Sequence, residues 1–365
     1  MVYYIAQKRL TVHHAGAKAP NDIYTLCEER GWTELLYPNI EKWGNPTISR
    51  IRRGFRVLWF WLTSFFRMKT NDIVFYQHPI RYGSKIAGAF IGQLRKRNVK
   101  FIMLIHDLDS LRFHFLYSDM SKTNVHYEDG EFLRLFDQII CHNTSMKDYL
   151  LLQGIPENRL VCLDLFDYLL PSQEFPASGR NTALSAKNLV IAGHLSKIKC
   201  GYIYELANLD PTLTLHLYGI NFADDSNALG SVIYHGSFNP DELPYVIEGK
   251  YGVIWDGNSI DTCEGATGNY LRYNNPHKLS LFMAVGIPVV TWSSAAIATF
   301  VDEKGVGITV NSLRELPKKL EQITDEQYRQ MQSNTALFQA RVSRGYYFNR
   351  AIDIAFARLL HQNQE

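Results

Sequence analysis

Short runs of apolar residues alternate with longer segments of helical periodicity along nearly the whole chain. In the first half, apolar runs typical of buried strands occupy 2–6, 33–37, 72–76, 99–105, 137–141 and 159–163. Helical segments separate them at about 21–30, 48–68, 82–97 and 144–153, and Asn21-Asp22 is the expected N-cap of the first. Because parallel strands need a helix to return the chain, this alternation predicts a parallel sheet covered on both faces.

The pattern breaks at 171–187, where Pro, Ser, Gly and Ala replace the apolar runs, and we interpret this segment as a linker. Beyond it, strands are expected at 188–193, 212–219, 231–236, 251–257 and 287–292, and helices near 197–209, 241–248, 276–285, 295–301 and 312–323. The period is mostly helical from Asp325 onward, with a break near Ser343-Arg344-Gly345. The expected organisation is an N-terminal domain at 1–170, a second domain at 188–335, and a helical tail at 336–365 that can pack back on the first domain.

Composition and charge narrow the class of protein. The chain has 365 residues, of which 46% are hydrophobic, so a disordered chain is excluded. With 38 basic and 36 acidic residues, no general nucleic-acid surface follows. The five cysteines form no CxxC pair, so we expect reduced, mostly buried thiols. No secretory signal or membrane-spanning run is evident, which predicts a cytoplasmic protein, with the inner face of the cell membrane as one place for it.

The most informative segment is 273–290, YNNPHKLSLFMAVGIPVV. Pro276 suits the first turn of a helix, because the N–H that proline lacks is not needed there. A helix N-terminus favours a phosphate, and Lys278 adds a positive charge in the same turn. The segment therefore predicts a phosphate site, although a cap, a core helix and a turn would give the same residues.

A helix that reads K-x-x-L-x-x-A-x-G-x-P-V-V resembles the nucleotide-sugar helix of many glycosyltransferases of the B fold. The longer string NNPHKLSLFMAVGIPVV is similar to one branch, the bacterial β-1,6-galactofuranosyltransferase-like and glucosyltransferase-3-like proteins. Further strings of this family are AGHLSK at 192–197, LYG at 217–219, VIWDG at 253–257, SSAAIATFV at 293–301, GITVNSL at 307–313, HDLDSLR at 106–112, CHNTSM at 141–146 and LFDYL at 165–169. The resemblance covers most of the chain and implies the α/β glycosyltransferase-B architecture, in which two Rossmann-like doubly wound domains face a cleft.

The resemblance also implies a reaction. A hexose, galactofuranose or glucose, would move from a UDP-sugar to a bacterial surface glycan, a lipid-linked oligosaccharide or a glycosylated adhesin. Many retaining enzymes of the fold have a Glu where this chain has Leu281, so inversion at the anomeric carbon is favoured. The UDP-sugar is a substrate, and no cofactor is expected. A nucleotide-sugar epimerase or hydrolase and a non-catalytic partner subunit remain alternatives.

Polar positions that follow strands of the second half lie where α/β proteins bind ligands. Gly193 allows close backbone approach, and Lys197 either reaches a phosphate or is a solvated lysine. By the resemblance, Tyr218 looks like a nucleobase contact, since an aromatic ring can stack on uracil. Asp256 either accepts hydrogen bonds from sugar hydroxyls or caps its loop. The expected nucleotide-sugar site consists of Gly193, Lys197, Tyr218, Asp256, Asn274, Asn275 and Lys278.

An inverting transfer needs a base that takes the proton of the acceptor hydroxyl. Asp107 and Asp109 follow the strand at 99–105 and should project from its carboxyl end, and neither is ahead as the base. A capping and ion-pair role would place the same residues there, in which case His13, His14 and His142 are the next candidates. The expected acceptor pocket consists of His106, Arg112, His142 and Asn143, and the loop with Gly16 and Lys18 is expected to close over donor or acceptor.

Two features concern metals and surfaces. The Asp107-x-Asp109 spacing resembles a metal-binding DxD motif only superficially, and no histidines have ligand spacing, so metal-independent transfer is expected. Arginines at 50–56 precede the aromatic run 57–66, which reads as a crossover helix packed on the sheet or as a basic amphipathic helix on an anionic membrane. Both hold if one face stays exposed. Besides the UDP-sugar and a glycan or glycoprotein acceptor, a peripheral membrane contact and a homo-oligomer therefore stay open as partners.

Overall fold

The computed structural model describes residues 1–7, 15–38, 46–80, 82–113, 127–171, 185, 187–223 and 231–361. The chain forms two compact units. The first comprises Met1–Leu10, Pro20–Leu163 and Phe348–Glu365, and the second comprises Thr11–Ala19 and Asp164–Tyr347. Most of the expected linker at 171–187 lies outside the described residues, and the last part of the expected tail belongs to the first unit.

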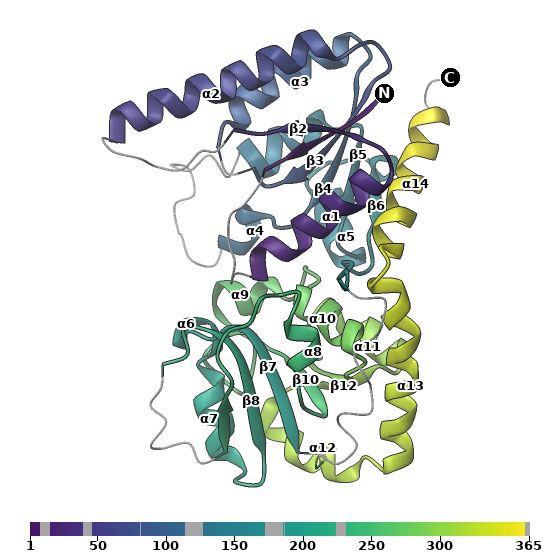
Figure 1. The fold of residues 1–365 in the computed structure, drawn as a ribbon. Helices are drawn as coiled ribbons and strands as arrows, with labels where there is room; N and C mark the ends of the chain where they lie inside the picture. The colour runs from purple at the N-terminus through teal and green to yellow at the C-terminus, as the bar shows by residue number, and fades with distance from the viewer. Residues whose placement is uncertain are drawn as a thin grey trace. The chain divides into compact units, whose positions relative to one another are not determined.

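A parallel six-stranded sheet with the order β2-β1-β3-β4-β5-β6 forms the centre of the first unit (Figure 1). Its strands are β1 (Val2–Ala6), β2 (Thr33–Leu36), β3 (Ile73–His78), β4 (Lys100–Ile105), β5 (Gln138–Cys141) and β6 (Leu160–Cys162). The six strands predicted for this half are confirmed. Strand β4 is buried from Phe101 to Ile105, as its continuous apolar run predicted for a strand covered on both faces.

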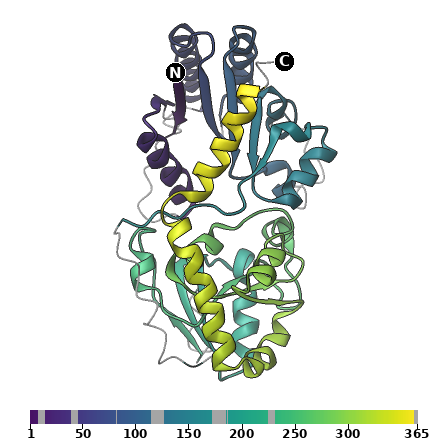
Figure 2. The same ribbon diagram turned by 90° about the vertical axis from the view of Figure 1, so that its right-hand side faces the viewer.

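Helices cover both faces of this sheet. They are α1 (Lys18–Glu29), α2 (Pro46–Arg67), α3 (Ser84–Lys96), α4 (Asp109–Phe113), α5 (Thr144–Leu152) and α14 (Tyr346–His361). Helix α14, the yellow helix that ends near the C-terminus in Figure 2, lies against one face of the sheet. Its Phe348 packs against Phe75 of β3 with 5.4 Å between ring centroids, whereas the next residue of β3, Tyr76, contacts Phe132 at 5.5 Å on the other face. The expected N-cap at Asn21-Asp22 is wrong, because α1 already begins at Lys18.

The second unit contains another parallel six-stranded sheet, with the order β12-β11-β10-β7-β8-β9. Its strands are β7 (Asn188–His194), β8 (Thr214–Ile220), β9 (Val232–Tyr234), β10 (Tyr251–Ile254), β11 (Val289–Trp292) and β12 (Gly307–Val310). The sequence pattern did not predict β12. This strand lies at the edge of the sheet and only Val310 is buried in it, so it lacks the apolar run that marks the inner strands.

The helices of the second unit are α6 (Lys197–Cys200), α7 (Tyr202–Leu209), α8 (Leu243–Val246), α9 (Gly265–Tyr270), α10 (His277–Val285), α11 (Ala298–Lys304), α12 (Leu316–Gln322) and α13 (Asp325–Val342). The single helix expected at 197–209 is divided into α6 and α7. The predicted break near 343–345 is confirmed, since α13 ends at Val342 and α14 begins at Tyr346.

Two expectations about the whole chain can be compared with the structure. All five cysteines are free thiols, and Cys27, Cys141, Cys200 and Cys263 are buried, as predicted. Among the described residues, no helix combines the length and the apolar character that a membrane span requires. Helix α2 has the length, with 22 residues, but five arginines interrupt its apolar positions.

Candidate functional site

The predicted donor residues of the second unit gather at the carboxyl ends of its central strands. Gly193 lies in the last part of β7 and Tyr218 in that of β8, while Asp256 follows β10 by two residues. Lys278 is in the first turn of α10, which begins after Pro276 as predicted. Ligands of parallel α/β sheets bind at this edge, so the location agrees with the expected role.

Asp256 is the centre of a buried charge cluster. Its Oδ1 accepts a hydrogen bond from Lys278 Nζ at 2.9 Å, and its Oδ2 lies 3.5 Å from Lys199 Nζ. Burial would raise the pKa of Asp256, but the two lysines outweigh burial and hold this pKa below its ordinary value. Burial would likewise lower the pKa of Lys278, and the Asp256 carboxylate outweighs it and raises this pKa. Both side chains are therefore charged at neutral pH.

Two glycines bring the backbone close to this cluster. Gly193 has a φ of +122°, and a Cβ at this position would lie 3.6 Å from Lys278 Cε. Gly219, in the neighbouring strand, has a φ of +155°, and its Cβ would come within 1.7 Å of the Gly193 carbonyl oxygen. A side chain at 219 would thus displace the end of β7 that carries Gly193. The close backbone approach of Gly193 to a ligand stays a prediction.

Tyr218 is more enclosed than a base-stacking residue needs to be. Its side chain is 2% exposed, and its ring lies parallel to that of His235 with 4.4 Å between centroids. The hydroxyl accepts a hydrogen bond from the backbone N–H of Glu248 at 3.1 Å. His235 would have to move before a nucleobase could stack on this face. The nucleobase contact stays a prediction.

The two asparagines before α10 differ in their surroundings. Asn275 is buried, and its Nδ2 donates to the carbonyl of Asp164 at 2.7 Å, which holds the start of α10 against the segment after β6. Asn274 Oδ1 is buried and has no hydrogen-bond partner among the described residues. An unsatisfied buried acceptor costs about 1–3 kcal/mol, so this oxygen is suited to a ligand hydroxyl or N–H. Asn274 therefore fits the predicted donor site better than Asn275 does.

The lysine that joins the cluster from α6 is Lys199, which the sequence analysis missed. The predicted residue, Lys197, is exposed, and its Nζ lies 4.9 Å above the ring of Tyr204. Both lysines belong to one short helix, in the string AGHLSKIK, so the second was visible in the sequence. Only the direction in which each side chain leaves the helix distinguishes them.

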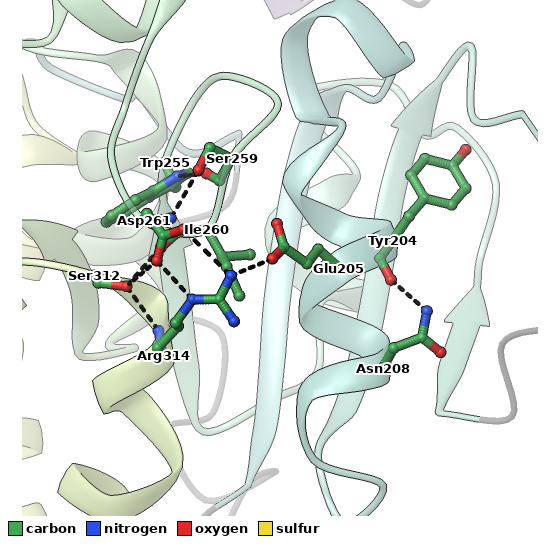
Figure 3. A network of polar contacts seen from close by, with 9 residues as sticks. All are labelled: Tyr204, Glu205, Asn208, Trp255, Ser259, Ile260, Asp261, Ser312 and Arg314. Carbon is green, nitrogen blue, oxygen red and sulfur yellow. Dashed lines mark hydrogen bonds and ion pairs between the residues drawn. The ribbon is translucent and has the colours of Figure 1, made fainter.

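The loop after β10 is fixed on another side by Arg314, which follows Ser312 at the start of the 3-10 helix η8 (Leu313–Glu315). Figure 3 shows the Arg314 guanidinium between Asp261 of this loop and Glu205 of α7, at 2.6 Å and 2.5 Å. The loop also folds back on itself, because Trp255 Nε1 donates to the Ser259 carbonyl at 2.9 Å. These contacts hold the segment that carries Asp256.

Lys18 is anchored within the second unit. Its side chain is 7% exposed, and Nζ donates to Asp241 Oδ1 and to the Leu169 carbonyl, both at 2.7 Å. Gly16 is exposed in the 3-10 helix η1 (Ala15–Ala17). The preceding part of the expected closing loop, with His13 and His14, lies outside the described residues. A role of Gly16 and Lys18 at a substrate stays a prediction.

In the first unit, the candidate bases follow β4 as predicted. Strand β4 ends at Ile105, and Asp107 lies between it and α4, which begins at Asp109. Asp107 Oδ2 is 3.3 Å from Arg112 Nη1, and this carboxylate is 34% exposed. His106 Nε2 is 2.5 Å from Gln77 Oε1 at the neighbouring end of β3. The structure thus brings His106, Asp107 and Arg112 together at one strand end.

Asp129 is a further residue of this region that sequence reasoning missed. It lies in the helical turn η3 (Tyr127–Glu131), where its Oδ1 accepts from His78 Nε2 at 2.8 Å. Its Oδ2 accepts from the backbone N–H of Ser110 at 2.5 Å, directly after Asp109. Asp129 thereby ties the start of α4 to the end of β3. Nothing in the surrounding string YEDGE indicated this long-range contact.

The acceptor-pocket prediction for His142 and Asn143 meets structural roles instead. His142 is 1% exposed, its Nε2 donates to the Ile105 carbonyl at 3.1 Å, and burial lowers its pKa to about 4. It is therefore a neutral core residue at pH 7, which counts against both its pocket role and its role as a reserve base. Asn143 is the N-cap of α5, since its side chain accepts from the Met146 N–H at 3.0 Å.

No group of three or more histidine, cysteine or carboxylate side chains within the described ranges has the arrangement of a metal site. Arg112 is the basic neighbour of this region, with its Nη1 3.3 Å from Asp107 Oδ2. Metal independence itself stays a prediction.

Comparisons with known proteins agree with the sequence resemblance. A family model described as "Glucosyltransferase 3-like, N-terminal domain" matches residues 2–165, and one described as "Glucosyltransferase 3-like, C-terminal domain" matches residues 189–355. Among curated relatives, the β-1,6-galactofuranosyltransferase WbbI of Escherichia coli is 28% identical over 357 residues, covering 96% of this chain and 97% of that protein. Glucosyltransferase 3 of Streptococcus gordonii is 25% identical over 350 residues, covering 94% of each chain.

Solved structures share the fold over the full length. A sucrose-phosphate synthase from Thermosynechococcus elongatus has a TM-score of 0.60 at 13% identity, covering 100% of this chain and 97% of that chain. The apo form of the lipopolysaccharide outer core galactosyltransferase WaaB also has a TM-score of 0.60, at 12% identity, covering 98% of this chain and 100% of that chain. The two parallel sheets are those of the glycosyltransferase-B fold. The chain belongs to the glucosyltransferase 3-like family, and its fold is the glycosyltransferase-B fold.

Proposed function

We propose that this glycosyltransferase takes a hexose, galactofuranose or glucose, from a UDP-sugar and transfers it with inversion to a glycan or glycoprotein acceptor. The observation that carries the proposal is the cluster of Asp256, Lys278 and Lys199 beside the first turn of α10. The names of the relatives, a galactofuranosyltransferase and a glucosyltransferase, support the two candidate sugars.

The cluster suits a diphosphate leaving group. When the anomeric carbon–oxygen bond breaks, negative charge develops on the departing diphosphate, and pre-placed cations stabilise it. Each lysine ammonium has three N–H donors, so Lys278 retains donors for phosphate oxygens while Asp256 accepts one. The N-terminal end of α10 adds to the positive potential. Asp256 thus holds both lysines in place before the donor binds.

The acceptor side of the reaction needs a base. The acceptor oxygen attacks the anomeric carbon as the bond to the diphosphate breaks, and the acceptor proton passes to a carboxylate. Asp107 and Asp109 at the carboxyl end of β4 are our candidates, and the contact of Arg112 Nη1 with Asp107 Oδ2 at 3.3 Å orients this carboxylate. Inversion requires no covalent intermediate, so one carboxylate suffices.

A donor panel tests this proposal. UDP-galactofuranose, UDP-glucose and UDP-galactose are incubated with the full chain, and UDP release is measured with Lys278→Ala and the exposed-lysine control Lys304→Ala in parallel. We expect one donor to release UDP, Lys278→Ala to bind UDP roughly 10- to 150-fold more weakly because it loses a charged hydrogen bond, and Lys304→Ala to match wild type. Conversion of a donor to its epimer without UDP release would identify an epimerase instead. Absence of UDP binding to wild type would identify a non-catalytic subunit.

The stereochemistry has its own measurement. The anomeric configuration of the transferred sugar, read by NMR from its coupling constant, should be opposite to that of the donor. Retention of configuration would contradict the assignment of a single base in the first unit.

A further inference from the structure

Helix α2 has an apolar face that the first unit does not cover. We call this surface the α2 face. Its side chains follow one another at intervals of three or four residues, apart from the adjacent pair Leu58-Trp59, and therefore lie along one side of the helix. The most exposed are Phe66 at 75%, Ile51 at 67%, Phe55 at 65% and Trp59 at 58%. The complete α2 face consists of Ile48, Ile51, Phe55, Leu58, Trp59, Leu62 and Phe66.

These side chains are surplus to the packing of the helix. The opposite side of α2 already supplies the core with Val57, Phe60 and Trp61, which are buried. Trp61 stacks on Phe90 of α3 with 6.3 Å between centroids, and Figure 1 shows the two helices side by side. The crossover-helix interpretation is thus confirmed for one side of α2. A second apolar side, rich in aromatic rings and left in water, points to a binding surface.

The charge around the α2 face is strongly one-sided. Residues 46–97 contain eleven basic residues and a single acidic one, in a chain whose net charge is +2. That acidic residue, Asp72, is 4% exposed and bound by the N-terminal ammonium of Met1 at 2.8 Å, so it does not offset the surface charge. Arg52 and Arg56 are exposed one turn apart, and their positions on the helix border the apolar side chains.

We propose that the α2 face binds the surface of an anionic lipid bilayer, with α2 lying in the plane of the interface. Aromatic and aliphatic side chains would enter the boundary between headgroups and acyl chains, while Arg52 and Arg56 contact lipid phosphates. A helix of 22 residues is about 33 Å long, enough to present the whole face at once. The proposal does not depend on which sugar is transferred.

A second copy of this chain is the other occupant that such a face admits. Pairing two α2 faces would bring two rows of arginines beside one another with no acidic residue on either helix to compensate. An anionic bilayer supplies the complementary charge that a second α2 lacks. The charge distribution therefore favours lipid over self-association.

Co-sedimentation with vesicles tests the proposal. The full chain is mixed with vesicles of phosphatidylcholine alone, or with phosphatidylglycerol added, at 0.1 M and 0.5 M salt. We expect at least tenfold stronger partition onto the anionic vesicles, and most of this preference should disappear at 0.5 M salt because the phosphate contacts are screened. Equal partition onto both vesicle types would overturn the proposal.

Three variants separate the contributions. Phe55→Ser with Trp59→Ser should reduce partition at least tenfold, and Arg52→Gln with Arg56→Gln roughly 25-fold, at about fivefold for each arginine. Leu152→Ser, at an exposed leucine of α5 that is 84% accessible, is the matched control and should leave partition unchanged. Thermal unfolding and UDP release must match wild type in every variant. If wild type ignores vesicles and Phe55→Ser with Trp59→Ser converts a multimer to a monomer in light scattering, the face is an interface between copies and the proposal is wrong.

Discussion

Replacement of Lys278 by Met should destabilise the second unit through Asp256. Methionine has nearly the length of lysine, so Lys278→Met removes the ammonium group without opening a large cavity. The Asp256 carboxylate, which is 8% exposed, then keeps Lys199 at 3.5 Å as its one remaining cation among the described residues. The perturbation is therefore the loss of one of two cations around a buried anion.

The magnitude follows from the number of partners that remain. Breaking a buried ion pair by removing one partner costs about 3–5 kcal/mol, because the other charge is left uncompensated. Since Lys199 still faces Asp256, we expect the lower end of this scale, about 3 kcal/mol. Adding Asp256→Asn removes the stranded charge, so the double variant should be more stable than Lys278→Met by about 1 kcal/mol or more.

Urea unfolding, followed by tryptophan fluorescence, measures these differences, with Lys304→Met as the control at an exposed lysine. The pH dependence gives a second check. The folded pKa of Asp256 is lowered, so its contribution to stability is complete above the unfolded value of about 3.9 and is lost as the pH falls through the folded pKa. The advantage of wild type over Asp256→Asn should therefore be constant from pH 6 to 8 and shrink below about pH 4.

The reasoning would be refuted by an unchanged urea midpoint for Lys278→Met together with no gain from the added Asp256→Asn. In that case Asp256 would be compensated by its surroundings without Lys278. An equal loss in Lys304→Met would show that the effect comes from general surface charge and not from the cluster.

Three further predictions concern the chemistry and the turn at Gly219. Replacing the true base, Asp107→Asn or Asp109→Asn, should lower kcat by roughly 10²- to 10⁴-fold while UDP affinity barely changes; near wild-type transfer by both variants would exclude the two aspartates. Transfer should continue in excess EDTA, and a loss of activity that Mn²⁺ or Mg²⁺ restores would require Asp107 and Asp109 to be reread as metal ligands. Gly219→Ala should destabilise the protein by more than about 3 kcal/mol, because its Cβ would lie 1.7 Å from the Gly193 carbonyl oxygen, whereas Gly236→Ala, with nothing within 4 Å of its Cβ, should lose only the 1–2 kcal/mol of backbone strain; equal urea midpoints for the two variants would contradict this.

The inner strands and long helices were predictable because each has a local signature. Strand β4 is apolar without interruption, and Pro276 marks the start of α10 as Gly286, with its φ of +73°, marks the end. Strand β12 at the edge needed no such run, so periodicity did not reveal it. A continuous apolar run, rather than the strand itself, is what the sequence pattern records, and the exposed edge strand β9 was predicted because Val232, Ile233 and Tyr234 form such a run.

The site was predictable in its location and less so in its partners. Asp256 and Lys278 were both expected at the donor site, but nothing local shows that they pair with each other across 22 positions. Lys199 and Asp129 were missed for the same reason, since their contacts depend on the direction of a side chain or on distant strands. His142 was misjudged because a histidine after a strand has the same local sequence whether it faces solvent or the core.

The division of the chain has a consequence for protein engineering. The second unit takes the segment Thr11–Ala19 from within the first, and the first takes back Phe348–Glu365 at the end. A single cut after residue 163 would therefore strip the first unit of α14, whose Phe348 packs on Phe75, and the second unit of Lys18, the ion-pair partner of Asp241. Exchange of a whole unit with a relative must transplant three separate segments for the first unit and two for the second, so the halves of this enzyme are not interchangeable cassettes.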